Sequence, residues 1–308
     1  MSNLDIKIKQ VTYKEKNELH ILFFGKDMNY VLMNTLRRLV IQHIPIYSFK
    51  RENIKITKNT SVFNNDTFSL RLSNIPIQNI KVEDLNDKYL DLFNKFEINQ
   101  EDFNNITLNL NKKNDGNNIL NVTTDHCEFY DKNGKIGNIY KKPVLLIKLK
   151  KNQEIKVSMV SELNIGLHHI IYSPVSICCY EEKNDNEFLL KLESKGQMNE
   201  YQLLKKACDI FKIKCLNLKI QIKDMKDIND NKGELVFKNE NHTIGNILSR
   251  YLQDHKNIVY TGYKMDHLMI EEVQIKYETD GTKNIKDILD EIIDICIMHF
   301  EHINKLLK

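Results

Sequence analysis

Features that would place this 308-residue chain in a membrane, outside the cell or on nucleic acid are missing from its sequence. No apolar run approaches the roughly 18 residues that a membrane-spanning helix requires, and the start, Met1–Lys7, lacks the apolar core of a signal peptide. Lys and Arg number 45 against 42 Asp and Glu, so the net charge is only +3 and gives no strong basic field for nucleic acid. We expect a soluble protein that is not secreted and does not bind a membrane.

The six cysteines form no Cys-x-x-Cys pair, and we interpret them as reduced thiols. His168-His169 upstream of Cys178-Cys179 is the one conceivable metal cluster. Adjacent residues on a strand point to opposite faces, so such pairs converge poorly on one ion. We therefore predict no metal and no cofactor.

Sequence motifs of catalysis are also missing. The chain has no phosphate-binding glycine loop, no dinucleotide fingerprint, no nucleophile elbow and no close pair of carboxylates for magnesium. We predict no catalytic residues. An enzyme with an unrecognised site would require convergent titratable side chains, which the sequence does not indicate.

The chain is organised around an apolar helix that carries two adjacent arginines. Residues 27–45 predict this helix, with Asp27 or Asn29 as its cap and leucines at helical spacing on one face. Arg37 and Arg38 diverge by about 100° on a helix, so they must meet different surroundings. We expect one to turn inward to a carboxylate or backbone carbonyl and the other to face a partner. Taken alone, the pattern also fits two solvated arginines.

A second copy of this motif lies at 241–252. The pattern Asn-x-Leu-x-Arg begins at Asn34 in the first helix and at Asn246 in the second, where Thr243 is a suitable N-cap. Apolar residues of the second copy recur at i, i+3, i+4, i+7 and i+8, which predicts an amphipathic helix. A short match of this kind can arise by chance, so a duplication is indicated only if the segments that follow the two helices also match in the same order.

Those further matches are an alternating strand, a glycine turn and another helix. The two strands are Glu187–Ser194 and Glu271–Thr279. In the first copy 162 positions separate Asn34 from Gly196, whereas 35 separate Asn246 from Gly281, so the first copy is longer by 127 positions. That difference is about the size of one inserted domain.

The composition supports this division. Between about 50 and 183 the chain changes to short alternating runs, Val175–Tyr180 among them, separated by Asn, Asp and Gly. Apolar stripes near Asn199–Phe211 and from about Asn284 onward predict two closing helices that pack on each other. The fold class is α+β, with two modules of antiparallel strands and two helices each. We predict a first module of 1–50 and 184–222, a β-rich insert at 51–183, a linker at 223–232 and a second module at 233–308.

Several of these stretches resemble the alpha-like assembly subunits of multisubunit DNA-directed RNA polymerases. Asn34-Thr-Leu-Arg-Arg-Leu with Ile44-Pro45, Phe68–Pro76 and Val144–Tyr180 are similar to the third-largest subunit of eukaryotic RNA polymerase II and to the bacterial alpha subunit. Residues 233–308 resemble its small partner, the eleventh subunit, through Asn241-His-Thr-Ile-Gly-Asn, Gly262-Tyr-Lys264 and Thr279-Asp-Gly281. A head-to-tail fusion of the two resembles the polymerase subunits of large cytoplasmic DNA viruses.

The resemblance implies a non-catalytic platform on which the two largest polymerase subunits and other subunits dock, with DNA contacted only through the complex. The two modules would form an intramolecular pseudo-heterodimer. The location would be the virion and host cytoplasm for a viral chain, and otherwise the nucleus. The family's third subunit carries zinc-binding cysteines, but Asp84–Ile106 here contains none, so the zinc site is expected to be lost.

Two sets of residues carry these expectations. Candidate partner-binding residues are Asn34, Leu36, Arg37, Arg38, Asn246 and Arg250. Candidate residues of the pairing of modules are Leu32, Leu39, Ile244, Ile247, Leu248, Tyr251, Ile288, Leu289, Ile292 and Cys296. The alternative function is a free-standing adaptor or DNA-binding protein, against which the net charge of +3 argues.

Overall fold

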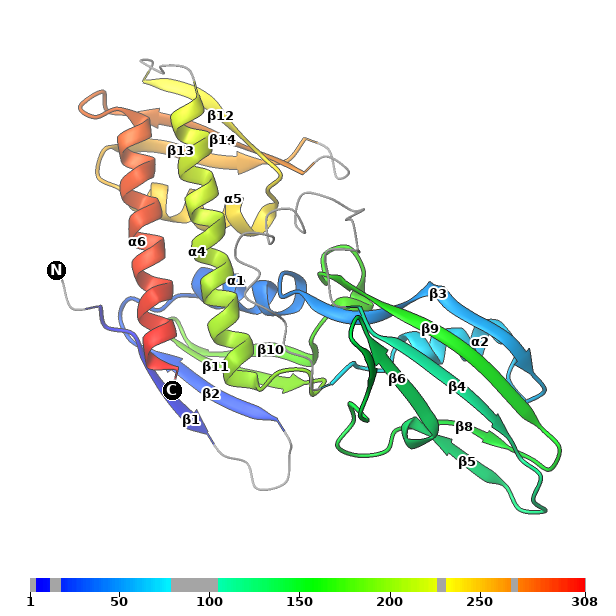
Figure 1. Ribbon diagram of the computed structural model, residues 1–308. Helices are drawn as coiled ribbons and strands as arrows, with labels where there is room; N and C mark the ends of the chain where they lie inside the picture. Colours follow the sequence, from blue (N-terminus) through cyan, green and yellow to red (C-terminus); the bar gives the residue numbers. More distant parts are fainter. Residues whose placement is uncertain (1–3, 12–17, 79–104, 226–230, 267–270, 308) are drawn as a thin grey trace.

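The first sheet of the molecule has four antiparallel strands in the order β1-β2-β11-β10. The computed structural model describes residues 4–11, 18–78, 105–225, 231–266 and 271–307. The strands of this sheet are β1 (Lys7–Val11), β2 (Leu19–Phe24), β10 (Val175–Asn184) and β11 (Glu187–Ser194). The helices of this half of the chain are α1 (Tyr30–Gln42), which contacts β10, and α4 (Glu200–Asp224), which contacts β11 (Figure 1).

The second sheet has three antiparallel strands in the order β12-β14-β13. They are β12 (Lys232–Lys238), β13 (Ile258–Lys264) and β14 (Glu272–Thr279), and the helices that follow β12 and β14 are α5 (His242–Gln253) and α6 (Ile285–Leu306). The order strand, helix, strand, strand, helix therefore repeats that of the first half, in which a long segment separates α1 from β10.

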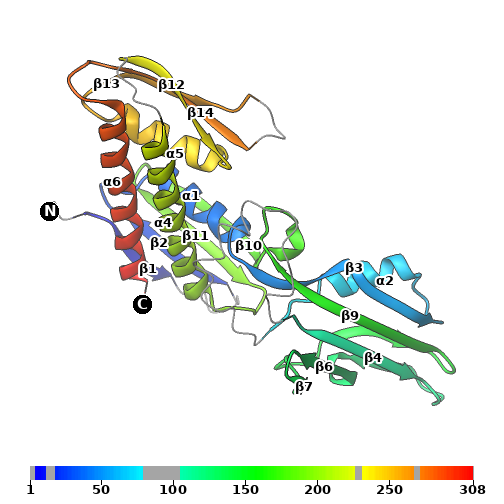
Figure 2. The same ribbon diagram turned by 45° about the horizontal axis from the view of Figure 1, so that its top comes forward.

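The helices α4 and α6 lie side by side and connect the two sheets, as Figure 1 and Figure 2 show. They are antiparallel, because Lys212 pairs with Glu301 at 2.6 Å while Lys219, later on α4, pairs with Asp294, earlier on α6, at 2.8 Å. The Phe211 and Phe300 rings stack between them with centroids 3.9 Å apart. One continuous hydrophobic core includes residues from both sheets and from α1, α4, α5 and α6. The expected packing of the two closing helices is confirmed.

Each of the described α-helices begins at an asparagine whose side chain accepts a backbone N–H of the first turn, which satisfies a donor that the helix itself cannot pair. These N-caps are Asn29, Asn64, Asn199, Asn241 and Asn284. The prediction of Asn29 as a cap of the first helix is confirmed. The prediction of Thr243 was wrong, because Asn241 caps α5: its Oδ1 accepts the backbone N–H of Thr243 at 3.0 Å.

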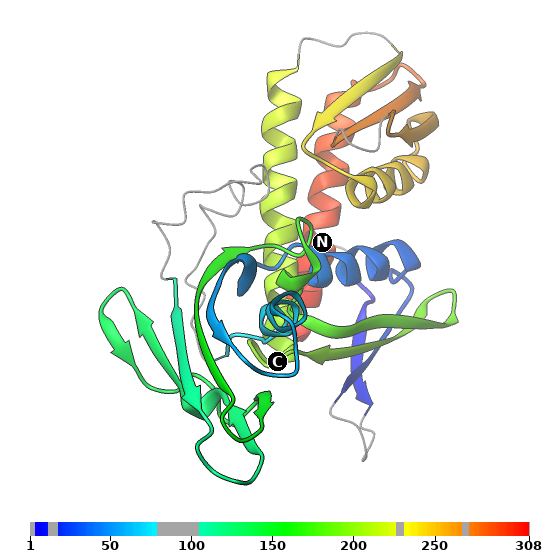
Figure 3. The ribbon, with the colours of Figure 1, turned by 90° about the vertical axis from the view of Figure 1, so that its right-hand side faces the viewer.

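The segment between α1 and β10 forms a separate β-rich unit with its own hydrophobic core. A five-stranded sheet, β3-β9-β4-β6-β7, faces a two-stranded sheet, β5-β8. Figure 1 shows this unit to the right of the paired helices, and Figure 3 shows the molecule from that side, with the unit in front. Its elements are β3 (Ile46–Asn59), α2 (Asn65–Ser73), β4 (Thr107–Lys113), β5 (Leu120–Thr123), β6 (Cys127–Asp131), β7 (Gly134–Ile136), β8 (Leu145–Leu149) and β9 (Glu154–Asn164). The predicted α+β architecture with antiparallel sheets is confirmed.

Three sequence boundaries differ from the structure. The strand predicted at Val175–Tyr180 is β10, which pairs with β11 in the first sheet rather than with the insert, so the insert ends before it. The chain enters the insert at β3. The first residue of this strand, Ile46, still belongs to the core of the framework, which is the name used here for the two sheets β1-β2-β11-β10 and β12-β14-β13 together with α1, α4, α5 and α6. Helix α4 continues to Asp224 and β12 begins at Lys232, so the predicted linker 223–232 overlaps both elements at its ends.

Candidate interface of the two modules and docking residues

The two adjacent arginines of α1 make different contacts. The Arg37 guanidinium donates to Asn34 Oδ1 on the same helix, at 3.2 Å from Nε and 2.9 Å from Nη2. The Arg38 Nε donates to the Thr243 hydroxyl of α5 at 2.7 Å and so connects the two halves of the chain. Burial lowers the pKa of Arg38, and the charge of Arg37 lowers it further.

The expectation for these arginines therefore needs one correction. Arg38 turns inward, but its partner is a hydroxyl and neither a carboxylate nor a backbone carbonyl. The expectation that Arg38 binds another subunit stays a prediction, and the contact that the structure gives its Nε lies within the chain. Arg37 and Asn34 are both half-buried at the surface of α1, where the Arg37 guanidinium donates to Asn34.

The equivalent residues of α5 lie differently. Arg250 is exposed and lies 3.6 Å from Asp254 one turn later on the same helix. Asn246 is half-buried. Gly245 faces the ring of Tyr263 on β13, and a Cβ at this position would lie 2.5 Å from Tyr263 Cδ2. The glycine of the second motif thus permits the close approach of α5 to its sheet.

One candidate docking residue is buried. Leu36 is 0% exposed and lies in the framework core, so it cannot present a surface to another subunit. The sequence motif places it between Asn34 and Arg38, but its helical position is that of the apolar stripe. The exposed or half-buried candidates that remain are Asn34, Arg37, Asn246 and Arg250.

The predicted pairing residues lie in the core that the two halves share. Tyr251 is half-buried, and its ring meets that of His299 edge-on with centroids 5.6 Å apart. The others are almost fully buried: Leu32, Leu39, Ile244, Ile247, Leu248, Ile288, Leu289, Ile292 and Cys296. The six cysteines are all free, and burial raises the pKa of the Cys296 thiol to about 12.

A buried ion pair between the two halves was missed at the level of sequence. Lys214 Nζ of α4 lies 2.9 Å from Glu240 Oε2, on the residue just before the N-cap of α5, and both side chains are 1% exposed. Burial lowers the pKa of Lys214 and raises that of Glu240, while each charge opposes the shift of the other. The available signal was that Lys214 falls on the same helical stripe as Phe211 and Leu218.

His43, the C-cap of α1, lies near this pair and is also fully buried. Burial holds its pKa well below the usual value, and the positive charges of Lys214 and Arg38 lower it further. The imidazole is therefore neutral near pH 7. The junction of the two halves thus contains a small polar cluster inside an otherwise apolar core.

The two histidines of the candidate metal cluster, His168 and His169, make contacts with nearby residues of the chain. His168 Nδ1 lies 2.7 Å from Asn164 Oδ1, and His169 Nδ1 accepts the Ile171 amide at 3.2 Å. Among the residues that the structure describes, no group of three or more His, Cys, Asp or Glu side chains is arranged to hold a metal ion. The cysteine-free stretch Asp84–Ile106 lies outside the described residues as far as position 104.

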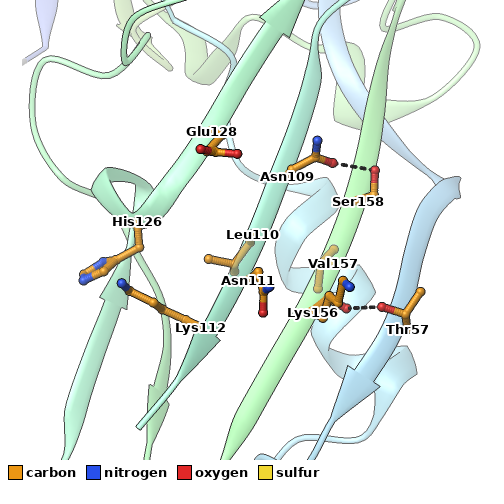
Figure 4. A pocket seen from close by; sticks show the side chains of 10 residues that line it. All are labelled: Thr57, Asn109, Leu110, Asn111, Lys112, His126, Glu128, Lys156, Val157 and Ser158. Atoms are coloured by element: carbon orange, nitrogen blue, oxygen red, sulfur yellow. Dashed lines mark hydrogen bonds between the residues drawn. The ribbon is translucent and has the colours of Figure 1, made fainter. Parts of the chain in front are cut away.

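A hollow of about 640 Å³ lies on the outer face of the five-stranded sheet (Figure 4). The Ser158 hydroxyl donates to Asn109 Oδ1 at 2.7 Å, and the Thr57 hydroxyl donates to the Lys156 carbonyl at 3.3 Å. Its carboxylate, Glu128, pairs with Lys135 at 2.6 Å. These side chains spread along neighbouring strands, as expected of the solvated face of a sheet.

In the described segments, none of the helices combines the length and apolarity of a membrane crossing.

Comparison with known proteins matches both halves of the chain to one family. Residues 23–215 and residues 232–306 each match an RNA polymerase Rpb3/Rpb11 dimerisation domain. A protein of Acanthamoeba polyphaga mimivirus, named as a DNA-directed RNA polymerase subunit, is 28% identical over 98% of this chain and 93% of its own length.

Archaeal relatives match either most of the chain or its last part. The RNA polymerase subunit Rpo3 of Methanocaldococcus jannaschii is 25% identical over 66% of this chain and 93% of its own length. The subunit Rpo11 of Metallosphaera sedula is 32% identical over 21% of this chain and 72% of its own length. The chain belongs to the RNA polymerase Rpb3/Rpb11 dimerisation-domain family and carries two such domains.

Proposed function

We propose that this chain is an assembly subunit of a DNA-directed RNA polymerase and acts in DNA-templated transcription as a non-catalytic platform. The observation that carries the proposal is that two dimerisation domains of this family follow one another in a single chain, and that a relative matching 98% of the chain is named as a polymerase subunit. The protein would act inside the cell. A viral chain would be found in the host cytoplasm and in the virion, and any other chain in the nucleus.

The two modules pair within the chain as a pseudo-heterodimer in this proposal. The first consists of β1, β2, α1, β10, β11 and α4, and the second runs from β12 to α6. Three observations support the pairing: the antiparallel packing of α4 on α6, the shared hydrophobic core, and the bond from Arg38 to Thr243. Neither module would bury its helical face without the other.

The two largest subunits of the polymerase would dock on polar residues of α1 and α5 that the chain itself leaves accessible. Arg37 and Arg250 are the charged members of this set, with Asn34 and Asn246 beside them. Arginine suits such contacts because its planar fork forms bidentate bonds with carboxylates. Contacts with DNA would be made through the complex, which agrees with the net charge of +3.

Capture of the large subunits tests this proposal. The tagged chain, purified from its native source, should bring with it the two largest polymerase subunits in equal amounts. The double variant Arg37→Glu/Arg250→Glu should keep the melting temperature of the parent and lose most of that capture. Arg51→Glu is the matched control, because Arg51 is a similarly exposed arginine on the insert.

Two results would contradict the proposal. Purification without any polymerase subunit would favour the free-standing adaptor, and retention on heparin far beyond that expected at a pI of about 8.3 would favour the DNA-binding alternative. Equal capture by the parent and the double variant would leave the platform role intact but remove these arginines from the docking surface.

A further inference from the structure

The buried ion pair of Lys214 and Glu240 is the one fully buried salt bridge among the described residues, and it joins the two modules. We propose that this pair is a specificity determinant, which makes unlike modules pair with each other and prevents pairing of like modules. The inference rests on the proposed pairing of modules and names the residues that direct it. The alternative pairings are real competitors, because both modules contain the order strand, helix, strand, strand, helix, with β1 as an additional strand in the first, and have similar apolar helices.

The repeat identifies the positions that would replace this pair if like modules met. Lys214 follows the N-cap Asn199 by 15 positions, and His299 follows the N-cap Asn284 by the same 15 positions. Met28 precedes the N-cap of α1 directly, just as Glu240 precedes the N-cap of α5. The counterparts of Lys214 and Glu240 in the repeat are therefore His299 and Met28.

In a pair of two first modules, each Lys214 would face Met28 of the other copy. Met28 is 0% exposed and apolar, so each ammonium group would be buried without Glu240. The neighbouring carboxylate, Asp27, aligns with Asn239 rather than with Glu240, and it accepts the Asp5 amide at 2.8 Å within its own module. Each ammonium group would lose the carboxylate that offsets its desolvation in the unlike pair, and two such losses would occur in a like pair.

In a pair of two second modules, each Glu240 would face His299 of the other copy. His299 Nδ1 lies 2.7 Å from the Ile295 carbonyl, so it carries the proton and donates to that oxygen. The neutral ring then presents Nε2 as an acceptor, which cannot donate to a carboxylate. Burial lowers the pKa of His299, which opposes the doubly protonated form that could donate.

Stability alone does not account for a lysine and a glutamate in this core. A buried ion pair is often no more stable than well-packed apolar residues of the same volume, since desolvation cancels most of the attraction. What apolar residues cannot supply is a penalty against the wrong partner. Lys214 lies in the first module and Glu240 in the second. Each kind of like pair would therefore bury two groups of the same charge without their partners, whereas the unlike pair brings the two opposite charges together.

The test uses the full chain with a protease site placed in segment 226–230. The folded protein is cleaved there, incubated in mild urea so that the fragments exchange, and analysed by native mass spectrometry. The wild type should give unlike pairs only, with like pairs below about 1 in 100, since loss of a buried partner corresponds to at least about a 100-fold change in equilibrium. Lys214→Met/Glu240→Met should melt near the parent temperature before cleavage, and like pairs should rise to between a quarter and a half of the total, about the statistical share.

The reversed pair, Lys214→Glu/Glu240→Lys, should restore unlike pairs only. The inference is overturned if the double methionine variant still forms unlike pairs alone, or if the reversed pair forms like pairs as readily as the methionine variant. Failure of the proposed function looks different: the cleaved wild type would separate into two fragments that do not associate at all.

Discussion

The hydrogen bond from Arg38 to Thr243 should contribute measurably to the stability of the framework. Substitution of Arg38 by Met removes the guanidinium and keeps the aliphatic stem, and substitution of Thr243 by Val removes the hydroxyl and keeps the shape. The two side chains meet at 2.7 Å between α1 and α5, and Thr243 is 5% exposed. Each substitution therefore deletes one partner of a bond between modules with little change in packing.

The size of the effect follows from burial. A hydrogen bond that involves a charged group contributes about 1.5–3 kcal/mol when it is protected from water. Arg38 is only half-buried, and solvent screens its charge, so we expect a coupling energy of about 1–2 kcal/mol in the double-mutant cycle. Arg250→Met is the matched control: it occupies the equivalent helix position, but its contact with Asp254 is exposed, and its loss should cost under about 0.5 kcal/mol.

The assay is urea unfolding followed by circular dichroism, because the chain contains no tryptophan. The framework and the insert have separate cores, so two transitions are expected, and the coupling belongs to the transition of the framework. A coupling energy below about 0.3 kcal/mol, which is the usual additivity error, would refute a role of this bond in holding the modules together.

Three further outcomes are expected. Gly245→Ala should destabilise the framework by about 1–2 kcal/mol despite a better helix propensity, because its methyl group overlaps the ring of Tyr263, and Tyr263→Leu should reverse most of that loss in thermal unfolding. Stability should fall by up to about 1.4 kcal/mol per pH unit as the pH drops below about 6.5, because the unfolded state then binds a proton that buried His43 excludes. The pH slope should flatten in His43→Gln and persist in the control His242→Gln, whose ring is exposed. Elemental analysis after dialysis against a mild chelator should find no stoichiometric zinc, and one zinc per chain would contradict the loss of the family's cysteine cluster.

Local patterns predicted many elements because those elements depend on nearby residues. The strand predicted at Glu187–Ser194 matches β11 at both ends, since a β-prone apolar run is closed by turn residues on either side. The helix predicted at Asn199–Phe211 covers only about the first half of α4, because four lysines and Asn217 interrupt the apolar pattern of the second half. Helix α2 was missed, since it buries only Phe68, Leu72 and Ser73.

Tertiary facts lay beyond the sequence. Whether the strand at Val175 pairs with the insert or with β11 depends on partners far away in the chain. The partner of Arg38 is 205 residues away, so the motif indicated that an arginine turns inward but not where it goes. Lysine is usually a surface residue, so the sequence did not predict that Lys214 is buried, although it lies on the apolar stripe of α4.

The pairing of β2 with β11 sets the order in which this chain gains structure during synthesis. Leu22 pairs with Leu189, which is made 167 positions later. At about 5–20 residues per second, the ribosome takes roughly 8 to 30 s to supply the missing strand. The insert closes on itself when β9 emerges, before β10 and β11 exist. Throughout that interval β10, α4 and α5, the elements that contact α1 in the folded chain, have not yet been made, so the apolar face of α1 is the segment of the nascent chain most in need of a chaperone.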